Sequence, residues 1–240
     1  MCYNVSVKSD KKVLEQRFQA KYDAAEETEP LYHVSGFLHP KLPVISSDNR
    51  ELIKLSAWGL IPSWVKDEKQ AGEMMTMTLN AKSETIFALP SFKNSIRQKR
   101  CLVLVDGFYE WRTIKKNKYP HFIYLKNKEP FAFGGIYSDW VNKATGEIIN
   151  SFSIITTKAN PLMEKIHNAK MRMPLILPKE TEEDWLNPDL NEKQITEMMQ
   201  PFSEALMEAH TISKLITSRA ENPNQPAVQE RFDYPELGLI

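Results

Sequence analysis

The stretch RCLVLVDGFYEW, residues 100–111, carries the clearest strand signal in this 240-residue chain. Its first part, Cys101–Val105, is a short apolar run that ends at a turn signal, as is typical of a buried strand. Further β-branched or aromatic runs separated by turn signals follow at His121–Leu125, Phe131–Tyr137, Ser151–Thr157 and Met173–Leu177. The middle of the chain is therefore predicted to be rich in strands, with a hairpin tip at Lys115–Lys118.

Working outward, the flanks predict a few helices around this sheet. The N-terminal residues 2–7 alternate in polarity and predict a first strand, and Asp10 can cap a helix over 10–25. Other predicted elements are a strand at Lys54–Leu60, helices at Thr181–Leu186 and 192–210, and an extended C-terminal tail at 220–240. We expect one α+β domain, residues 1–240, built on a curved and mostly antiparallel sheet.

Charge is balanced, with 31 basic and 31 acidic residues, so the net charge favours neither a nucleic-acid binder nor a membrane binder. The stretch from Lys93 to Lys118 is different. Its basic residues are Lys93, Arg97, Lys99, Arg100, Arg112, Lys115, Lys116 and Lys118, against the acids Asp106 and Glu110. This stretch is either a binding surface for a polyanion or a set of solvated loops.

Two cysteines form no disulfide framework, which fits a reducing compartment. The N-terminal MCYNVSVKSDKK lacks the apolar stretch of a secretory signal, and no run approaches the ~18 apolar residues that span a bilayer. We therefore expect a cytoplasmic protein with no membrane partner. His33 and His39 have no acidic or cysteine partner at useful spacing, so no metal site is predicted.

Cys2 is the first candidate for chemistry. Removal of Met1 would give Cys2 a free α-amine beside its thiol. Such a 1,2-aminothiol condenses with an aldehyde to an imine, and the thiolate then closes a five-membered thiazolidine ring. The alternative is that a cysteine stands at this position by chance. Cys101, in its apolar run, is expected to be a buried and inert thiol.

Glu110 and His167 are candidates for proton transfer. Glu110 stands among aromatic residues, so burial would raise its pKa toward neutrality; the alternative is an ion pair with Arg112 or a lysine. Asn160 and Pro161 predict a short helix that ends at His167, where the helix dipole favours imidazolium. The alternative there is a histidine that only caps the helix.

Asn80 and two tryptophans are weaker candidates. The Asn80 amide could orient the N-terminal amine or a sugar hydroxyl, or it could simply cap a helix beginning nearby. Trp58 and Trp64, in WGLIPSW, could stack on bases or belong to the core.

Taken in order, these segments resemble the SOS-response-associated peptidase (SRAP) family, which includes abasic-site DNA–protein crosslinking proteins. The matching segments are Cys2, WGLIPSW (58–64), NAKSET (80–85), RCLVLVDGFYEW (100–111), FAFGGIY (131–137), SFSIITTKAN (151–160), IH (166–167), RMPLIL (172–177) and Trp185–Leu186. The resemblance implies a single α+β domain with a β-barrel-like core and a positively charged cleft for single-stranded DNA.

The resemblance also implies roles for individual residues. Cys2 would be crosslinked to the abasic site, Asn80 would lie beside the sugar, Glu110 would be the general acid/base, and His167 would position or protonate the sugar oxygen. We expect these four residues to converge on one cleft. The expected DNA-binding residues are Lys82, Arg172, Trp58, Trp64, Arg100 and Arg112, with Arg172 holding a phosphate.

Three departures from the family pattern concern DNA contacts. Tyr3 and Asn4 follow Cys2 where the family commonly has Gly-Arg, and Lys82 replaces an arginine. Residues 168–171 separate His167 from Arg172, which suggests an insertion. We therefore expect the crosslinking chemistry to be kept and DNA binding to be weaker or differently tuned.

The resulting hypothesis is a monomeric sensor of abasic sites in single-stranded DNA. It crosslinks Cys2 to the ring-opened sugar, shields the site from strand cleavage and requires no cofactor. Two alternatives remain: a thiol autopeptidase that removes its own N-terminus, and a non-catalytic module that binds single-stranded DNA.

Overall fold

Five strands of the computed structural model, which describes residues 2–23 and 28–237, form a closed barrel. In ring order they are β11 (Ile148–Lys158), β10 (Phe131–Val141), β7 (Arg100–Val105), β4 (Lys41–Ser46) and β5 (Asn49–Trp58). Parallel pairing of Ala57 and Trp58 with Ser151 and Phe152 joins β5 to β11 and closes the ring, and the other four pairings are antiparallel. The first half of the stretch 100–111 forms β7, in which every residue is buried.

Three short strands extend the barrel and carry site residues. β6 (Asn80–Lys82) pairs in parallel with β11, and β12 (Arg172–Pro174) pairs with the same strand in the antiparallel sense. β2 (Lys21–Tyr22) lies beside β5. Because β6 and β12 share β11, Lys82 and Arg172 flank the same stretch, Thr156–Lys158.

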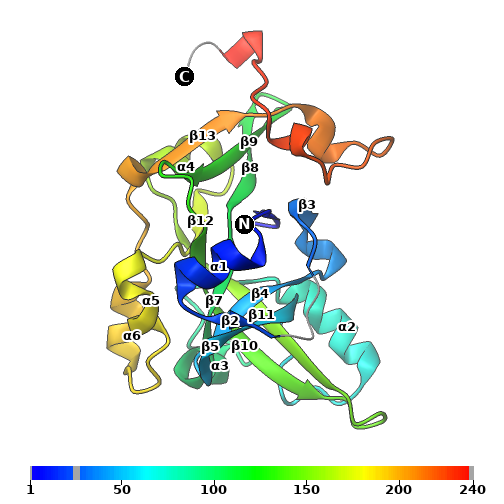
Figure 1. Cartoon of the computed structure of the whole chain (residues 1–240), viewed down its shortest axis with the longest axis vertical. Coiled ribbons are helices and arrows are strands. Elements are labelled where there is room, and N and C mark those ends of the chain that lie inside the picture. Colours follow the sequence, from blue (N-terminus) through cyan, green and yellow to red (C-terminus); the bar gives the residue numbers. More distant parts are fainter. Residues whose placement is uncertain (1, 24–27, 238–240) are drawn as a thin grey trace.

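A second sheet stands against the barrel (Figure 1). Its strand order is β13 (Met207–Thr211), β9 (Asn117–Leu125), β8 (Gly107–Ile114), β1 (Asn4–Val7) and β3 (Leu31–Ser35). β8 follows β7 after Asp106 alone, and the Asp106 carboxylate accepts the backbone N–H groups of Lys8 (2.6 Å) and Ser9 (2.9 Å). β1 and β8 meet through only two residue pairs.

Short helices surround the sheets. They are α1 (Lys11–Phe18), α2 (Glu68–Met77), α3 (Lys93–Gln98), α4 (Pro161–Ile166), α5 (Glu182–Trp185) and α6 (Glu192–Met198). Asp10 caps α1 as predicted, but the helix ends at Phe18, because the next residue, Gln19, is left-handed with a φ of 52°. It is therefore shorter than the predicted 10–25, of which residues 24 and 25 lie outside the described part. Arg17 at its end binds Glu182 of α5 at 3.0 and 2.8 Å.

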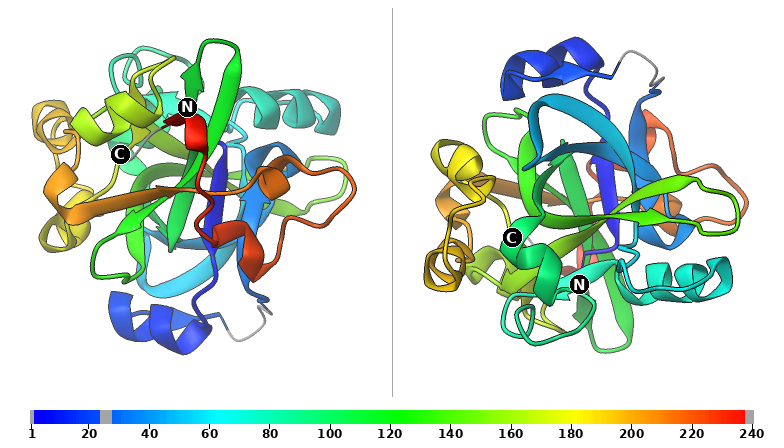
Figure 2. Two further views of the ribbon diagram at one scale, coloured as in Figure 1. Left: turned by 90° about the horizontal axis from the view of Figure 1, so that it is seen from above. Right: turned by 90° about the horizontal axis from the view of Figure 1, so that it is seen from below.

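The architecture confirms the predicted α+β domain with a barrel-like, mostly antiparallel sheet. The predicted helix over 192–210 is wrong: α6 ends at Met198, Pro201 follows, and 207–211 form β13. Beyond β13 come the 3-10 turns η4 (Lys214–Thr217), η5 (Pro226–Gln229) and η6 (Pro235–Leu237). The left view of Figure 2 shows this orange-to-red segment crossing the molecule near β1. Among the described helices, none is long and apolar enough to span a membrane.

Candidate active site

Cys2, two residues before β1, is held by Asn80. The Asn80 amide Nδ2 donates to the Cys2 carbonyl at 2.9 Å, and pairing of β6 with Ile154 of β11 fixes Asn80. Because Asn80 lies in a strand, the alternative in which it caps a helix is wrong. Its Oδ1 is buried and accepts no hydrogen bond from any residue in the described ranges, so it can receive one more donor.

The thiol of Cys2 is buried and directed at the backbone. Its Sγ lies 3.7 Å from the Asn4 carbonyl oxygen. Burial raises the pKa of the Cys2 thiol well above its ordinary value, and the negative charge of Glu110 raises it further. The thiol is therefore protonated at neutral pH and needs a partner to take its proton before it can attack.

Glu110 lies in β8 with its side chain only 6% exposed. Burial raises the pKa of Glu110 to about 8, because the surroundings disfavour the carboxylate. Glu110 Oε1 lies 3.7 Å from His167 Nδ1. A carboxyl group that titrates near neutrality can both give and take a proton.

His167 follows the last turn of α4, as predicted from its capping sequence. The Asn160 side chain accepts the Met163 N–H at 2.9 Å, and Pro161 begins the helix. His167 Nδ1 lies 2.8 Å from the Arg172 carbonyl, an acceptor only, so Nδ1 carries the hydrogen and Nε2 the lone pair. Burial lowers the pKa of His167 to about 4. The expectation of an imidazolium stabilised by the helix dipole is therefore wrong, because desolvation outweighs the dipole.

The structure brings the four candidate residues together as two contacting pairs. Asn80 binds Cys2, Glu110 adjoins His167, and Glu110 lies close enough to Cys2 to influence its thiol. Four different segments supply these residues: the residues just before β1, β6, β8 and the end of α4. The arrangement groups Cys2 with Glu110, which is protonated near neutrality, and with His167, which carries a lone pair on Nε2.

Arg172 is engaged by protein groups. Its guanidinium binds Glu84 through two bonds of 2.8 and 3.0 Å, and Nη2 also donates to the Thr156 carbonyl at 2.6 Å. The planar guanidinium that was expected to bind a phosphate binds the Glu84 carboxylate in this arrangement. What Arg172 does supply is the carbonyl that fixes the His167 tautomer.

Two expected DNA-binding residues belong to the core. Trp58 is 0% exposed and its Nε1 donates to the Leu79 carbonyl at 2.8 Å. Arg100 is also 0% exposed, and its guanidinium donates to the carbonyls of Ile96, Arg97, Trp185 and Asn187. Assigning these two side chains to DNA is therefore wrong, because neither reaches the surface. Trp64 and Lys82 are exposed and Arg112 is half-buried.

The basic stretch Lys93–Lys118 does not form one surface. Around α3, Arg97 pairs with Glu192 at 3.0 Å, and Lys99 pairs with Asp139 at 2.9 Å. The β8–β9 hairpin forms as predicted, with an exposed basic tip next to α4, since Asn168 binds both backbone groups of Thr113 at 2.9 and 2.8 Å. We call this surface the hairpin patch; its members are Arg112, Lys115, Lys116, Lys118, Lys165 and Lys170.

Some of these features were not found from the sequence. Lys165 and Lys170 flank His167, and this spacing is the one signal that could have placed them near the site. Nothing in the sequence pairs Glu84 with Arg172, or Asn168 with Thr113. No group of three or more His, Cys, Asp or Glu side chains that could hold a metal occurs within residues 2–23 and 28–237.

A family model described as SOS response associated peptidase (SRAP) matches residues 1–219. The chain belongs to the SRAP family. This SRAP chain is 40% identical over 198 residues to the abasic site processing protein YoqW of Bacillus subtilis, covering 82% of this chain and 84% of that one. It is 31% identical over 182 residues to the chicken (Gallus gallus) abasic site processing protein HMCES, covering 67% of this chain and 52% of that one.

Solved structures place the SRAP chain in the same fold. A crystal structure of a protein from Bacteroides thetaiotaomicron superposes with a TM-score of 0.90 at 39% identity, covering 96% of this chain and 100% of the other. A protein from Bordetella bronchiseptica gives a TM-score of 0.76 at 24% identity, covering 88% and 100%, and shows the fold alone. The predicted fold and family are both confirmed.

Proposed function

We propose that this SRAP protein processes abasic sites in single-stranded DNA by covalent capture of the open sugar aldehyde on Cys2. One observation carries the proposal: the Asn80 amide holds the carbonyl of residue 2 at 2.9 Å, in a site that also contains Glu110 and His167. Membership of the SRAP family, with relatives named abasic site processing proteins, supports the choice of substrate.

The chemistry depends on a free α-amine at Cys2, so Met1, which lies outside the described residues, must be removed. The amine then adds to the C1 aldehyde of the open sugar, and loss of water gives an imine. The Cys2 sulfur adds to the imine carbon while the nitrogen takes a proton, which closes the thiazolidine. One water is released overall, nothing is oxidised or reduced, and no cofactor is required.

Glu110 and His167 supply the proton transfers. With its pKa raised to about 8 by burial, Glu110 is protonated at neutral pH. It can protonate the ring oxygen as the sugar opens, or the hydroxyl that leaves as water. The lone pair on His167 Nε2 can accept a hydrogen bond from a sugar hydroxyl. The Asn80 Oδ1 acceptor faces the same end of β1 and suits the α-amine of residue 2.

DNA contacts come from the hairpin patch and Lys82 in this proposal. The patch lies beside the end of α4, so a strand bound there passes His167. Phosphate contacts by lysines would make binding strongly dependent on salt. All four reacting residues come from one chain, so a monomer suffices. Both cysteines are free thiols, which supports a reducing compartment such as the cytoplasm.

The test is to mix the Met1-processed protein with single-stranded DNA that contains one abasic site, then separate the mixture under denaturing conditions. We expect a covalent complex with the parent and with Cys101→Ala, the control for the other thiol. Cys2→Ala should give none. A denaturation-resistant complex formed by Cys2→Ala would overturn the proposal. Equal affinity for intact and abasic strands without any adduct would instead identify a non-catalytic DNA-binding module.

A second activity, removal of the protein's own N-terminus, is favoured by the proximity of Glu110 to His167 beside Cys2. In this reaction the thiol attacks the carbonyl of residue 1, and the peptide bond to Cys2 breaks to leave a thioester and a free α-amine. Water then hydrolyses the thioester and releases Met1, and the two side chains carry the protons. Expression in a host without methionine aminopeptidase tests it by mass spectrometry of the N-terminus. Loss of Met1 in the parent but not in Glu110→Gln supports autoprocessing; retention of Met1 in both refutes it.

A further inference from the structure

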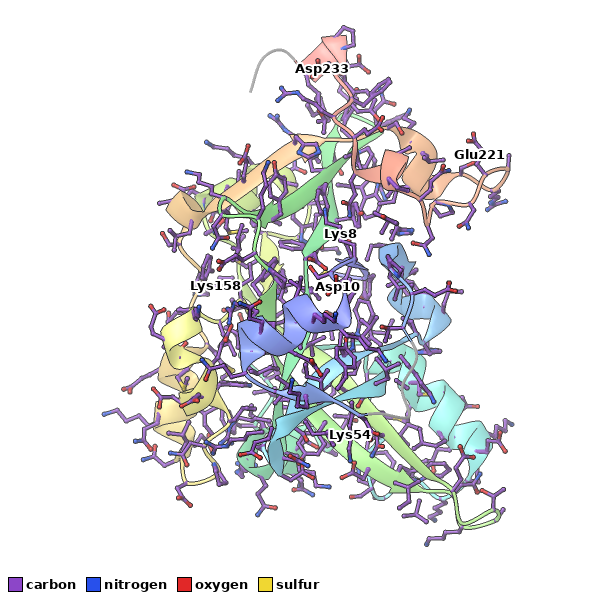
Figure 3. All side chains as sticks on the ribbon, viewed as in Figure 1. Lys8, Asp10, Lys54, Lys158, Glu221 and Asp233 are labelled. Carbon is purple, nitrogen blue, oxygen red and sulfur yellow. The ribbon has the colours of Figure 1, made fainter. Side chains whose placement is uncertain are left out.

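The C-terminal segment that follows the SRAP match is attached to the strand that follows Cys2. The match ends at residue 219, and Gln229 lies ten residues beyond it. The Gln229 amide Nε2 donates to Ser6 Oγ of β1 at 2.8 Å and lies 3.2 Å from both the Tyr109 hydroxyl of β8 and the Tyr32 carbonyl of β3. Its Oε1 accepts from Lys8 Nζ at 2.9 Å; Lys8 is labelled in Figure 3. One side chain thus contacts three strands.

These contacts fall on a short junction of the second sheet. β1 follows Cys2 and β8 carries Glu110, and the two strands pair through Val5 with Phe108 and Ser6 with Gly107. Asp106, just before β8, adds bonds to Ser6, Lys8 and Ser9. Gln229 adds a bond on each side of that junction. Contacts from the C-terminal segment therefore add to the bonds that hold the strand after Cys2 beside the strand of Glu110.

The segment is itself firmly held. Val228 is buried in an apolar cluster with Tyr109 and Phe122. His210 Nε2 lies 2.8 Å from the Gln229 carbonyl, and the Phe232 N–H donates to Thr211 at 2.9 Å. Several anchors along the segment therefore keep the Gln229 amide in place.

Gln229 acts on the opposite side of the sheet from the reaction. Neighbouring residues of a strand point to opposite faces, so Tyr109 faces Gln229 while Glu110 faces His167. A side chain in this position cannot touch the sugar. Any effect it has on the reaction must pass through the placement of β1 against β8.

We propose that Gln229 is a positioning residue for the proposed reaction: it fixes β1, the strand that follows the nucleophile, relative to Glu110. The C-terminal segment is then a working part of the site, although it lies outside the family match. The inference rests on the proposed function, because it assumes that Cys2 and Glu110 react together. Misplacement of reacting groups by about 1 Å can lower a rate a hundredfold, so a tether of this kind matters for rate more than for binding.

The test compares Gln229→Ala and Gln229→Glu with the parent. The glutamate variant keeps the size of the side chain and the bond from Lys8 but loses the donors to Ser6 and Tyr109. It therefore tests the same bonds if the alanine variant does not fold. Glu230→Ala, an exposed neighbour in the same segment, is the matched control. The measurements are the crosslinking rate constant at saturating abasic DNA, the concentration of DNA for half-saturation, the pH profile and the thermal midpoint.

We expect both Gln229 variants to lower the saturating rate constant by about tenfold or more, with the half-saturating concentration unchanged. The alkaline limb of the pH profile, set by Glu110, should shift as well. Glu230→Ala should behave as the parent. An unchanged rate in the Gln229 variants, or a loss of rate that only follows the unfolded fraction, would overturn the inference. Failure of the parent itself to crosslink would instead refute the proposed function.

Discussion

Glu110 Oε1 and His167 Nδ1 lie 3.7 Å apart, yet both side chains are neutral at pH 7. Burial raises the pKa of Glu110 to about 8 and lowers the pKa of His167 to about 4. The pair is therefore not a salt bridge. It is a proton donor beside a lone-pair carrier, which is the charge state that acid-catalysed opening of a sugar ring needs.

This charge state predicts a bell-shaped pH profile for crosslinking. The rate should rise as the Cys2 amine loses its proton, with a pKa near ~8, and fall as Glu110 loses its own, also at about 8. Glu110→Gln should be slower by roughly 10²–10⁴-fold and should lack the alkaline limb. Rates measured between pH 5 and 10 check this, and an alkaline limb that persists in Glu110→Gln would assign it to another group.

Stability should respond to the same carboxyl group. The folded pKa of Glu110 lies above its unfolded value, so the folded state holds the proton more tightly and stability falls as pH rises toward about 8. Glu110→Gln removes this contribution. The free energy of unfolding of the variant should exceed that of the parent at pH 9 by on the order of a few kcal/mol, and the difference should shrink toward pH 5. Urea titrations at the two pH values measure it.

Asn80 should be required for the reaction more than for folding. Asn80→Asp keeps the shape but loses the donor that holds the Cys2 carbonyl, and it adds a charge in a buried position. We expect crosslinking to fall at least tenfold and stability to fall by about 1–3 kcal/mol. Single-turnover rates and thermal melts separate the two effects; full crosslinking by Asn80→Asp would exclude the amide from the mechanism.

Arg100 should matter for stability and not for DNA. Arg100→Met removes a guanidinium that makes four hydrogen bonds to backbone carbonyls, and it takes those donors away from buried carbonyls. We expect a loss of about 3 kcal/mol or more in the free energy of unfolding. The affinity for single-stranded DNA and its salt dependence should be the same as in the parent. A smaller slope of log affinity against log salt in Arg100→Met would show that Arg100 contacts DNA.

The hairpin patch should account for the salt dependence of binding. Lys116→Ala and Lys170→Ala should each reduce the slope of log affinity against log salt by about 0.7, the value for one phosphate of a single strand. Lys143→Ala, an exposed lysine in the β10–β11 turn, is the control and should leave the slope unchanged. Equal slopes in all three variants would place the DNA elsewhere.

The sequence predicted the strands well because their signals are local. The apolar run of β7 and the capping of α4 by Asn160 depend on neighbouring residues alone, and both form as expected. The residues of the candidate site could not be identified from local signals in this way. Cys2, Asn80 and Glu110 each had an ordinary alternative, and only the ordered motifs of the family singled them out together.

What could not be predicted depends on contacts between distant segments. The burial of Arg100 follows from carbonyls of α5 and its C-terminal turn, more than 80 residues away. The two bonds between Glu84 and Arg172 cross 88 positions, and they engage the guanidinium that was expected to hold a phosphate. The neutral state of His167 depends on how deeply its ring is buried, which a helix-end signal does not report.

The hydrogen bond from Gln229 to Ser6 joins residues 223 positions apart, and this separation affects when the site is completed during protein synthesis. Cys2 leaves the ribosome before Glu110, and Glu110 leaves it before Gln229. During translation at ~5–20 residues per second, the nucleophile belongs to an unfinished chain for many seconds. A nascent chain that does not yet include Gln229 would then carry the reactive terminus without its complete surroundings, and full reactivity would begin only after Gln229 has emerged.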